Sequence, residues 1–224
     1  MAIIVSQIKT ALSQFESQEV FEKKAIESAR KTAKIHTEEI AQAYLTKSSV
    51  DARKKEQIYL VSSVGFELTD PQKEEEILKR TQNGKSAQFI KQQNHSSPDF
   101  VLGTEKTEYP PVIVGFGPAG MFAGLALARM GYRPIILERG AEVDRRVEAV
   151  EGFWTGKALD TATNVQFGEG GAGTFSDGKL TTRINDSRCS FILEELIRHG
   201  APEEIRYRQK PHIGTDLLRR VVKN

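Results

Sequence analysis

Three glycines at a fixed spacing could hold a diphosphate group. Gly115, Gly117 and Gly120 form a GxGxxG pattern between the apolar run 112–114 and a segment with helical periodicity. In such a pattern the first glycine permits a tight turn, the second lets the backbone approach a pyrophosphate, and the third lets helix and strand pack closely. The N-terminus of the helix adds free N–H donors and a partial positive charge. The pattern therefore predicts binding of a dinucleotide.

A carboxylate follows where an adenosine ribose would lie. The apolar run 134–137 predicts a second strand, and it ends at Glu138. An acid at this position accepts hydrogen bonds from ribose hydroxyls. Its negative charge also repels a 2′-phosphate, so we do not expect NADP in this glycine turn. NAD-dependent and FAD-dependent enzymes share the pattern, so these residues leave the choice between NAD and FAD open.

A second glycine-rich stretch spans residues 164–183, with five glycines between 168 and 178. Glycines allow close backbone approach and unusual φ values, which suits a loop that wraps a ligand. The alternative is a flexible surface loop. The apolar residues between the glycines favour the ligand-binding interpretation, because a flexible loop would not need them. They are Val165, Phe167, Phe175 and Leu180.

The elements that position these residues belong to a chain with two composition regimes. Residues 1–82 are rich in Lys, Glu, Gln and Ser, whereas most of the 18 glycines follow Gly103. The segment between them is polar and contains Gly and Pro, as linkers do. We expect a small α+β domain over residues 1–82, a linker or irregular segment over 83–110, and a second domain over 111–224.

The order of elements in the first domain follows from periodicity and caps. Residues 3–8 alternate as a strand, residues 19–33 have helical spacing, and residues 37–43 suggest a further short helix. Two β-rich runs flank the charged segment 51–56, which predicts a hairpin. Asp70 before Pro71 is a typical helix start. Strand, helix, strand, strand, helix indicates a small α+β sandwich, with a ferredoxin-like arrangement as a candidate.

Charge and composition exclude several functional classes. The 32 Lys and Arg against 30 Asp and Glu leave a net charge of +2, too balanced to predict attraction to nucleic acid or a membrane. The basic stretch Arg53, Lys54 and Lys55 could contact an anion or RNA, but a solvated hairpin tip is the favoured interpretation. The single Cys189 and the scattered histidines predict no metal site. Without a signal sequence or long apolar run, we expect a cytoplasmic protein with no membrane partner.

Several segments together resemble a known group of flavoproteins. The sequences GFGPAG, ERG, NVQFGEGGAGTFSDGKLTTR and KPHIGTD occur in this order, as in the bacterial FAD-dependent dehydrogenases called NAD(FAD)-utilising dehydrogenases. The first two resemble the first βαβ unit of FAD enzymes of glutathione-reductase type. The resemblance implies an α/β, Rossmann-like FAD-binding domain after the small α+β domain. It implies FAD as the cofactor and admits NADH or NADPH as the electron donor.

The resemblance also implies which residues contact FAD. Glu138 would hold the ribose of the AMP half, and the second glycine run would follow the pyrophosphate toward the flavin ring. No side chain is assigned as a catalyst. The implied cofactor-binding residues are Gly115, Gly117, Pro118, Ala119, Gly120, Glu138, Arg139, Gly170, Gly171, Ala172, Gly173, Thr174, Ser176 and Lys179.

The resemblance covers the chain but only the front part of such an enzyme. We therefore expect a truncated FAD domain, without the part that contacts the small-molecule substrate. The expected function of the complete enzyme is that of an FAD-dependent oxidoreductase. A catalytically inactive dinucleotide-binding remnant and an NAD-only dehydrogenase are the alternatives. The sequence names neither the substrate nor the oligomeric state.

Overall fold

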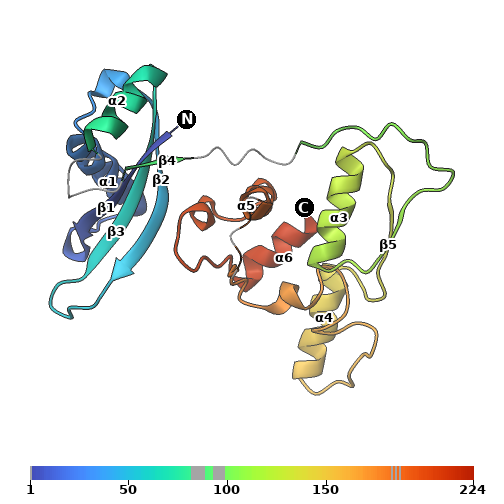
Figure 1. Cartoon of the computed structure of the whole chain (residues 1–224). Helices are drawn as coiled ribbons and strands as arrows, with labels where there is room; N and C mark the ends of the chain where they lie inside the picture. Colours follow the sequence, from blue (N-terminus) through green and yellow to red (C-terminus); the bar gives the residue numbers. More distant parts are fainter. Residues whose placement is uncertain (1, 82–88, 93–98, 183, 185, 187) are drawn as a thin grey trace. The chain divides into compact units, whose positions relative to one another are not determined.

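The fold is that of a computed structural model, which describes residues 2–81, 89–92, 99–182, 184, 186 and 188–224 (Figure 1). The chain forms two compact units. Unit 1 comprises Met1–His95 and Arg206–Gln209, and unit 2 comprises Ser96–Ile205 and Lys210–Asn224. An antiparallel sheet lies in unit 1 and a two-stranded parallel sheet in unit 2. The expectation of a mixed α/β chain is thus confirmed.

Unit 1 contains a four-stranded sheet in the order β2-β3-β1-β4, with every neighbouring pair antiparallel. The predicted hairpin is confirmed, since β2 and β3 pair along their length and Asp51 lies opposite Tyr59. The predicted helix over 37–43 is wrong. A short 3-10 turn covers only Thr37–Glu39, and the strand β2 begins at Ile40. The elements are β1 (Ala2–Ala11), α1 (Gln18–Ala33), β2 (Ile40–Asp51), β3 (Tyr59–Leu68), α2 (Pro71–Thr81) and β4 (Phe89–Gln92).

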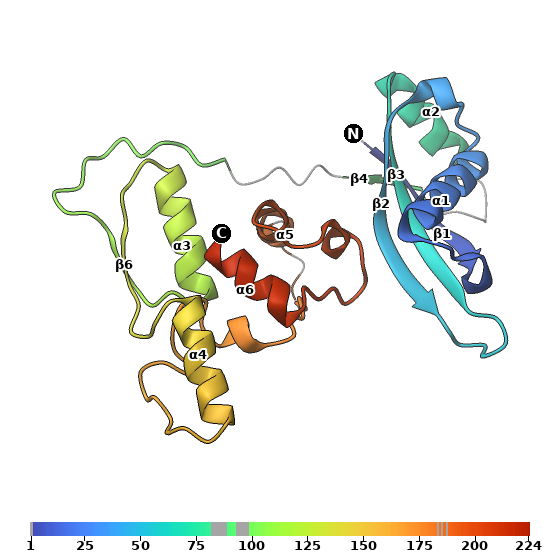
Figure 2. The same ribbon diagram turned by 180° about the vertical axis from the view of Figure 1, so that it is seen from behind.

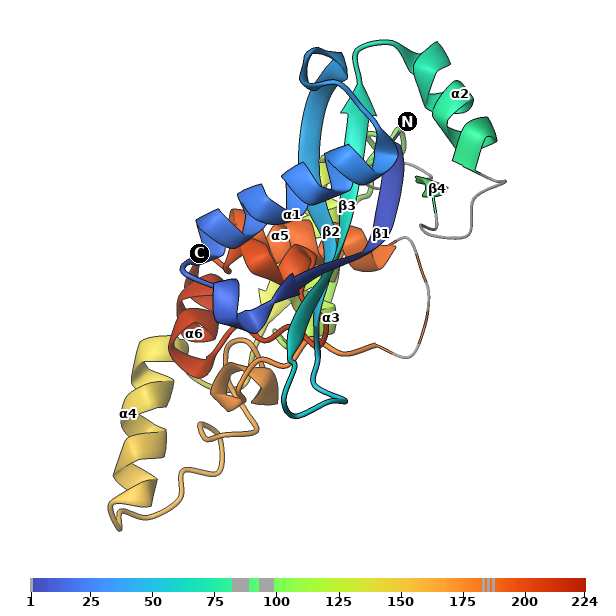
Figure 3. The same cartoon turned by 90° about the vertical axis from the view of Figure 1, so that its left-hand side faces the viewer.

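The core of unit 1 lies between the sheet and its helices. Figure 3 shows α1 crossing one face of the sheet. Four side chains at helical spacing on α1 are buried against inward residues of β1 and β3. Ser17 caps the helix by accepting a hydrogen bond from the Val20 N–H, and Lys34 ends it in the left-handed conformation. The four buried residues are Phe21, Ala25, Ala29 and Ala33.

Two segments of unit 1 fall outside residues 1–82. The strand β4 lies in the range expected to be a linker, and it pairs with β1. Arg206–Gln209 runs beside β2: the Ser48 N–H donates to the Tyr207 carbonyl at 2.7 Å, and the Gln209 N–H donates to the Ser48 carbonyl at 2.8 Å. The Tyr207 hydroxyl also donates to Glu22 at 2.8 Å. Backbone pairing between distant segments leaves little trace in a sequence, which explains both differences.

Unit 2 is built on the parallel pair of β5 and β6, in which Val112 lies opposite Ile135. The helix α3 connects them and runs alongside (Figure 2). Gly124 of α3 faces Ile113 and Ile136, so the helix packs closely on this face of the sheet. The elements are β5 (Val112–Val114), α3 (Pro118–Arg129), β6 (Ile135–Leu137), α4 (Val143–Trp154), α5 (Arg188–Arg198) and α6 (Thr215–Lys223).

The opposite face of this small sheet is open. A continuous apolar run such as 112–114 predicts a strand buried on both faces. That prediction is wrong for the described chain, because Val112 is 58% exposed and Val114 is 85% exposed. Ile135 and Leu137 are exposed beside them. The α3 helix covers the Ile113 face, and no other described residues bury the Val114 face.

A second core in unit 2 joins α5, α6 and the segment between them. Ala201, Ile205, Ile213 and Val221 are buried together. This packing holds α5, α6 and the segment between them together, after the second glycine run.

Within the described ranges, no helix has both the length and the hydropathy that a membrane crossing requires.

Candidate functional site

The first glycine run forms the turn between β5 and α3. Gly115 has φ +95°, a left-handed conformation that favours glycine. Its N–H donates to the Leu137 carbonyl at 2.7 Å, which continues the parallel pairing into the turn. A Cβ atom on Gly120 would overlap the Gly115 carbonyl oxygen. Glycine at both positions therefore lets the helix begin directly on top of the strand.

The N-terminus of α3 opens at this turn. Gly117 is the N-cap residue and Pro118, which has no N–H, is the first helical residue. Ala119 and Gly120 follow in the first turn, where backbone N–H groups lack acceptors within the helix. The first turn contains no acidic side chain. The partial positive charge of the helix end is therefore available to a phosphate.

Glu138 is tied to the same turn. Its carboxylate accepts a hydrogen bond from the Phe116 N–H at 2.7 Å and another from the Gly140 N–H at 2.9 Å. Desolvation by burial acts to raise the pKa of Glu138, but backbone N–H donors at Gly140, Phe116, Arg139 and Gly168 outweigh it, so the pKa lies below its usual value. The carboxylate is thus ionised at neutral pH. A carboxylate offers about four acceptor positions, and the hydrogen bonds from Phe116 and Gly140 occupy two of them.

The second glycine run packs against the first. The Gly170 N–H donates to the Phe116 carbonyl at 2.8 Å. Gly171 has φ +66°, and a Cβ atom there would lie 3.1 Å from the Cα of Gly117. The structure therefore brings Gly115, Gly117, Gly120, Glu138, Gly170 and Gly171 into one cluster. Pro118 and Ala119 are exposed at its edge.

The polar side chains of the second run bond within their own loop. Thr174 is fully buried and donates to the Glu169 carbonyl at 3.1 Å. Ser176 donates to the Gly173 carbonyl at 2.7 Å. Lys179 forms an ion pair with Asp177 at 2.8 Å. In the described part of the chain these side-chain bonds do not reach the first glycine turn, and the hydroxyl of Thr174 holds the loop's own backbone.

The remaining expected residues differ in their surroundings. Arg139 is exposed, and its guanidinium group lies 3.6 Å from the centre of the Phe167 ring, a cation–π contact. Ala172 is exposed. A Cβ atom on Gly173 would meet no atom within 4 Å. The Phe167 ring thus fixes Arg139 next to Glu138, whereas Gly173 borders open space.

Arg146 organises the second glycine run and was not predicted. It is completely buried, and its guanidinium group donates to four backbone carbonyls of that run. Burial lowers the pKa of Arg146, but the usual arginine value is so high that the group stays charged. The four carbonyls belong to Asn164, Val165, Gly168 and Glu169, at 2.9, 2.8, 3.3 and 2.6 Å.

One signal in the sequence could have identified this arginine. Arg146 lies between Val143 and Val150 on the buried face of α4, whereas its neighbour Arg145 is exposed. A charged residue at a helical core position requires buried hydrogen-bond acceptors. The carboxylate of Glu169 adds to this arrangement, since it accepts from the Val143 N–H at 2.8 Å at the start of α4.

Comparison with known proteins describes relatives without an assigned activity. Residues 2–67, within unit 1, match a family described as a domain of unknown function, DUF8436. An uncharacterized protein of Clostridium beijerinckii (strain ATCC 51743 / NCIMB 8052) is 48% identical over 224 residues. The match covers 100% of this chain and 40% of that protein. The chain therefore spans well under two thirds of that relative.

Proposed function

We propose that unit 2 binds FAD through the glycine turn and that the protein is an FAD-dependent oxidoreductase. The observation that carries the proposal is the hydrogen bond from the Phe116 N–H to the Glu138 carboxylate. It holds the ribose-binding acid and the phosphate-binding turn at one edge of the β5–β6 pair. In open parallel sheets, nucleotides bind outside the carboxyl ends of the strands.

The residues present fit the AMP half of FAD. The N–H groups of Ala119 and Gly120 would donate to the pyrophosphate, and the glycine turn leaves room for close approach. Glu138 would accept hydrogen bonds from the ribose hydroxyls. When bound, FAD supplies a flavin ring that accepts or donates a hydride, while the protein binds and orients it.

The second glycine run would extend the same site along the pyrophosphate. Support comes from the hydrogen bond between Gly170 and Phe116 and from the close approach of Gly171 to Gly117. Arg146 would keep this run in position through its hydrogen bonds to backbone carbonyls. Ala172, Gly173, Ser176 and Lys179 are candidates for contacts nearer the flavin.

The fold assignments are part of the proposal. Parallel pairing, the glycine turn at the strand-to-helix junction and the acid after β6 support a first βαβ unit of Rossmann-like, glutathione-reductase type. The antiparallel order β2-β3-β1-β4 supports a ferredoxin-like arrangement for unit 1.

Equilibrium dialysis of the purified chain against FAD, FMN and NADH tests the proposal. We expect saturable binding of FAD and little binding of FMN, because FMN lacks the adenosine half that Glu138 would recognise. ADP should displace FAD for the same reason. Binding of NADH without FAD would support an NAD-only dehydrogenase instead. Failure to bind any of them would support a dinucleotide-binding remnant that has lost its ligand.

A further inference from the structure

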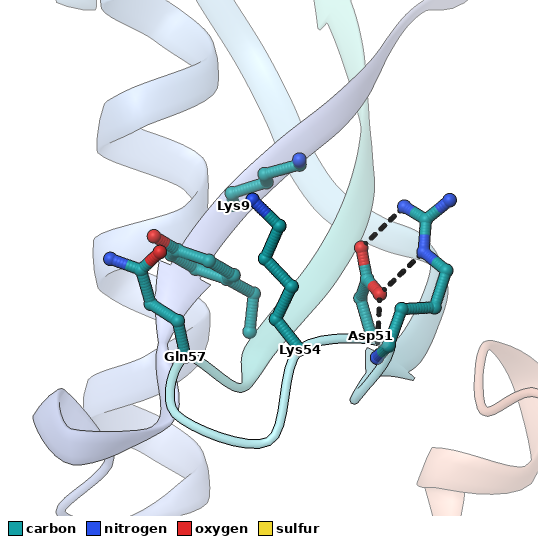
Figure 4. A pocket seen from close by; sticks show the side chains of 6 residues that line it. Lys9, Asp51, Lys54 and Gln57 are labelled. Carbon is teal, nitrogen blue, oxygen red and sulfur yellow. Dashed lines mark hydrogen bonds and ion pairs between the residues drawn. The ribbon is translucent and has the colours of Figure 1, made fainter.

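Unit 1 has a hollow of about 760 Å³ at the end of the β2–β3 hairpin. Figure 4 shows the side chains of Lys9 and Lys54 extending into it from β1 and from the hairpin loop. Nothing in the proposed FAD site uses this region, which lies in the other unit. Six residues line it: Lys9, Asp51, Arg53, Lys54, Gln57 and Tyr59.

Backbone pairing fixes the shape of this hollow. Tyr59 lies opposite Asp51 in the hairpin and opposite Ala11 of β1, so the ends of three strands meet there. The Leu12 N–H donates to the Ile58 carbonyl at 2.9 Å. These contacts hold the hairpin loop against the end of β1. The expected solvated hairpin tip is confirmed, because Arg53, Lys54 and Lys55 are exposed, and two of them also line this hollow.

One acidic and one basic side chain of the hollow form an ion pair with each other. Asp51 accepts two hydrogen bonds from the Arg53 guanidinium, at 2.8 and 2.7 Å, and a third from the Arg53 N–H at 3.3 Å. The side-chain hydrogen bond from Arg53 is the main reason that the pKa of Asp51 lies well below its usual range. Asp51 and Arg53 thus neutralise each other.

The other two cationic side chains in the lining are Lys9 and Lys54. Lys9 lies 5.7 Å from the centre of the Tyr59 ring, close enough for a cation–π contact. Among the residues that the structure describes, neither Lys9 nor Lys54 forms an ion pair. Three cationic side chains against one carboxylate leave two positive charges in the lining. An anion would relieve their mutual repulsion.

We propose that this hollow binds the phosphate group of a small phosphorylated ligand. Lysine ammonium groups bind phosphate as point charges, whereas planar carboxylates are best bound by the arginine fork, which Asp51 already occupies here. Gln57 adds an amide that can donate a hydrogen bond, and Tyr59 adds a ring. The volume lies within the roughly 300–1,000 Å³ of small-molecule sites.

A small ligand is favoured over RNA. RNA-binding surfaces present basic side chains over an extended area. This chain has a net charge of only +2, and the excess of two positive charges in this lining is confined to one hollow. Binding of RNA at this surface is one of the outcomes that would contradict the proposal. The inference is independent of FAD binding, since it concerns unit 1 alone.

Amide NMR spectra of the chain titrated with inorganic pyrophosphate test the proposal. We expect saturable shifts at Gln57 and Tyr59, and little response to succinate. Lys9→Gln and Lys54→Gln should each weaken pyrophosphate binding at least fivefold. Lys55→Gln is the matched control, because Lys55 is exposed in the same loop but does not line the hollow. It should change the affinity less than twofold.

Three outcomes would overturn the proposal. One is an equal loss of affinity in Lys54→Gln and Lys55→Gln, which would indicate diffuse attraction to the loop. Another is a pyrophosphate response confined to residues 115–120, which would locate phosphate binding in unit 2 alone. The third is tight binding of a single-stranded RNA oligomer together with no pyrophosphate response at Gln57 and Tyr59.

Discussion

The Phe116 N–H donates a hydrogen bond of 2.7 Å to the Glu138 carboxylate, so the turn after β5 is joined to the residue that follows β6. The two residues come from opposite ends of the β5–α3–β6 unit. Their bond orients the acid before any ligand binds, which lowers the cost of ordering it on binding.

Acid should weaken unit 2 partly through Glu138. Its folded-state pKa is lowered, so the carboxylate stabilises the fold above the usual glutamate pKa of about 4.3, and this contribution is lost as pH falls toward the folded value. Urea unfolding monitored between neutral and acid pH checks this. Glu138→Gln should be less stable at neutral pH and should lose less stability on acidification. An identical pH dependence in both proteins would contradict the assigned role.

Gly120→Ala should destabilise the glycine turn. The added methyl group would overlap the Gly115 carbonyl oxygen, and the backbone would have to shift. Overpacking of this kind costs about 1–3 kcal/mol. Gly173→Ala is the control for stability, because its Cβ atom would meet nothing within 4 Å. Thermal unfolding should show a lower midpoint for the first variant only. Equal unfolding midpoints for Gly120→Ala and Gly173→Ala would show that the glycine turn has room for a methyl group at position 120.

Arg146→Met should be among the most destabilising changes in unit 2. It leaves four carbonyls of the second glycine run without their donor, at about 1–3 kcal/mol for each group that stays buried and unsatisfied. Arg145→Met, on the exposed side of the same helix, should change stability by less than about 0.5 kcal/mol. Urea denaturation of the two variants gives the comparison. If Arg146→Met lost no more unfolding free energy than Arg145→Met, the hydrogen bonds of Arg146 would not contribute to the stability of unit 2.

The open face of the β5–β6 pair should bind an apolar dye. Val114 is 85% exposed, next to Val112, Ile135 and Leu137, and such a patch on a surface attracts apolar partners. Val114→Thr should reduce the fluorescence of 8-anilinonaphthalene-1-sulfonate with the chain while leaving the melting temperature nearly unchanged. Ile113→Thr, on the face under α3, should instead lower the melting temperature. Unchanged dye fluorescence in Val114→Thr would contradict this prediction.

The parts of the fold that could be predicted from sequence are those with local causes. The strand, glycine turn and helix over 112–129 follow from an apolar run, a spacing of glycines and Pro at the helix start. The helix at Pro71 follows from its cap residue. The two glycine runs lie close together, as a shared site requires.

Other features depend on partners that the sequence does not specify. The strand β4 and the segment Arg206–Gln209 join the sheet through backbone hydrogen bonds, which any residues can form. The hydrogen-bond acceptors of Arg146 are backbone carbonyls, which residues of any type supply, so side-chain types do not indicate its hydrogen-bond partners. The exposure of Val114 depends on what covers the sheet, and a strand sequence alone does not determine its neighbours.

The affinity of the chain for FAD, measured by titration in wild type and Glu138→Gln, tests the central claim most directly. Glu148→Gln is the matched control, because it removes the same charge from an exposed position on α4. We predict saturable binding by wild type and Glu148→Gln, and binding roughly 10- to 100-fold weaker in Glu138→Gln, as expected for a hydrogen bond to a charged group. Equal affinity in all three proteins, or no saturable binding by wild type, would contradict the assignment of Glu138 and the glycine turn to FAD.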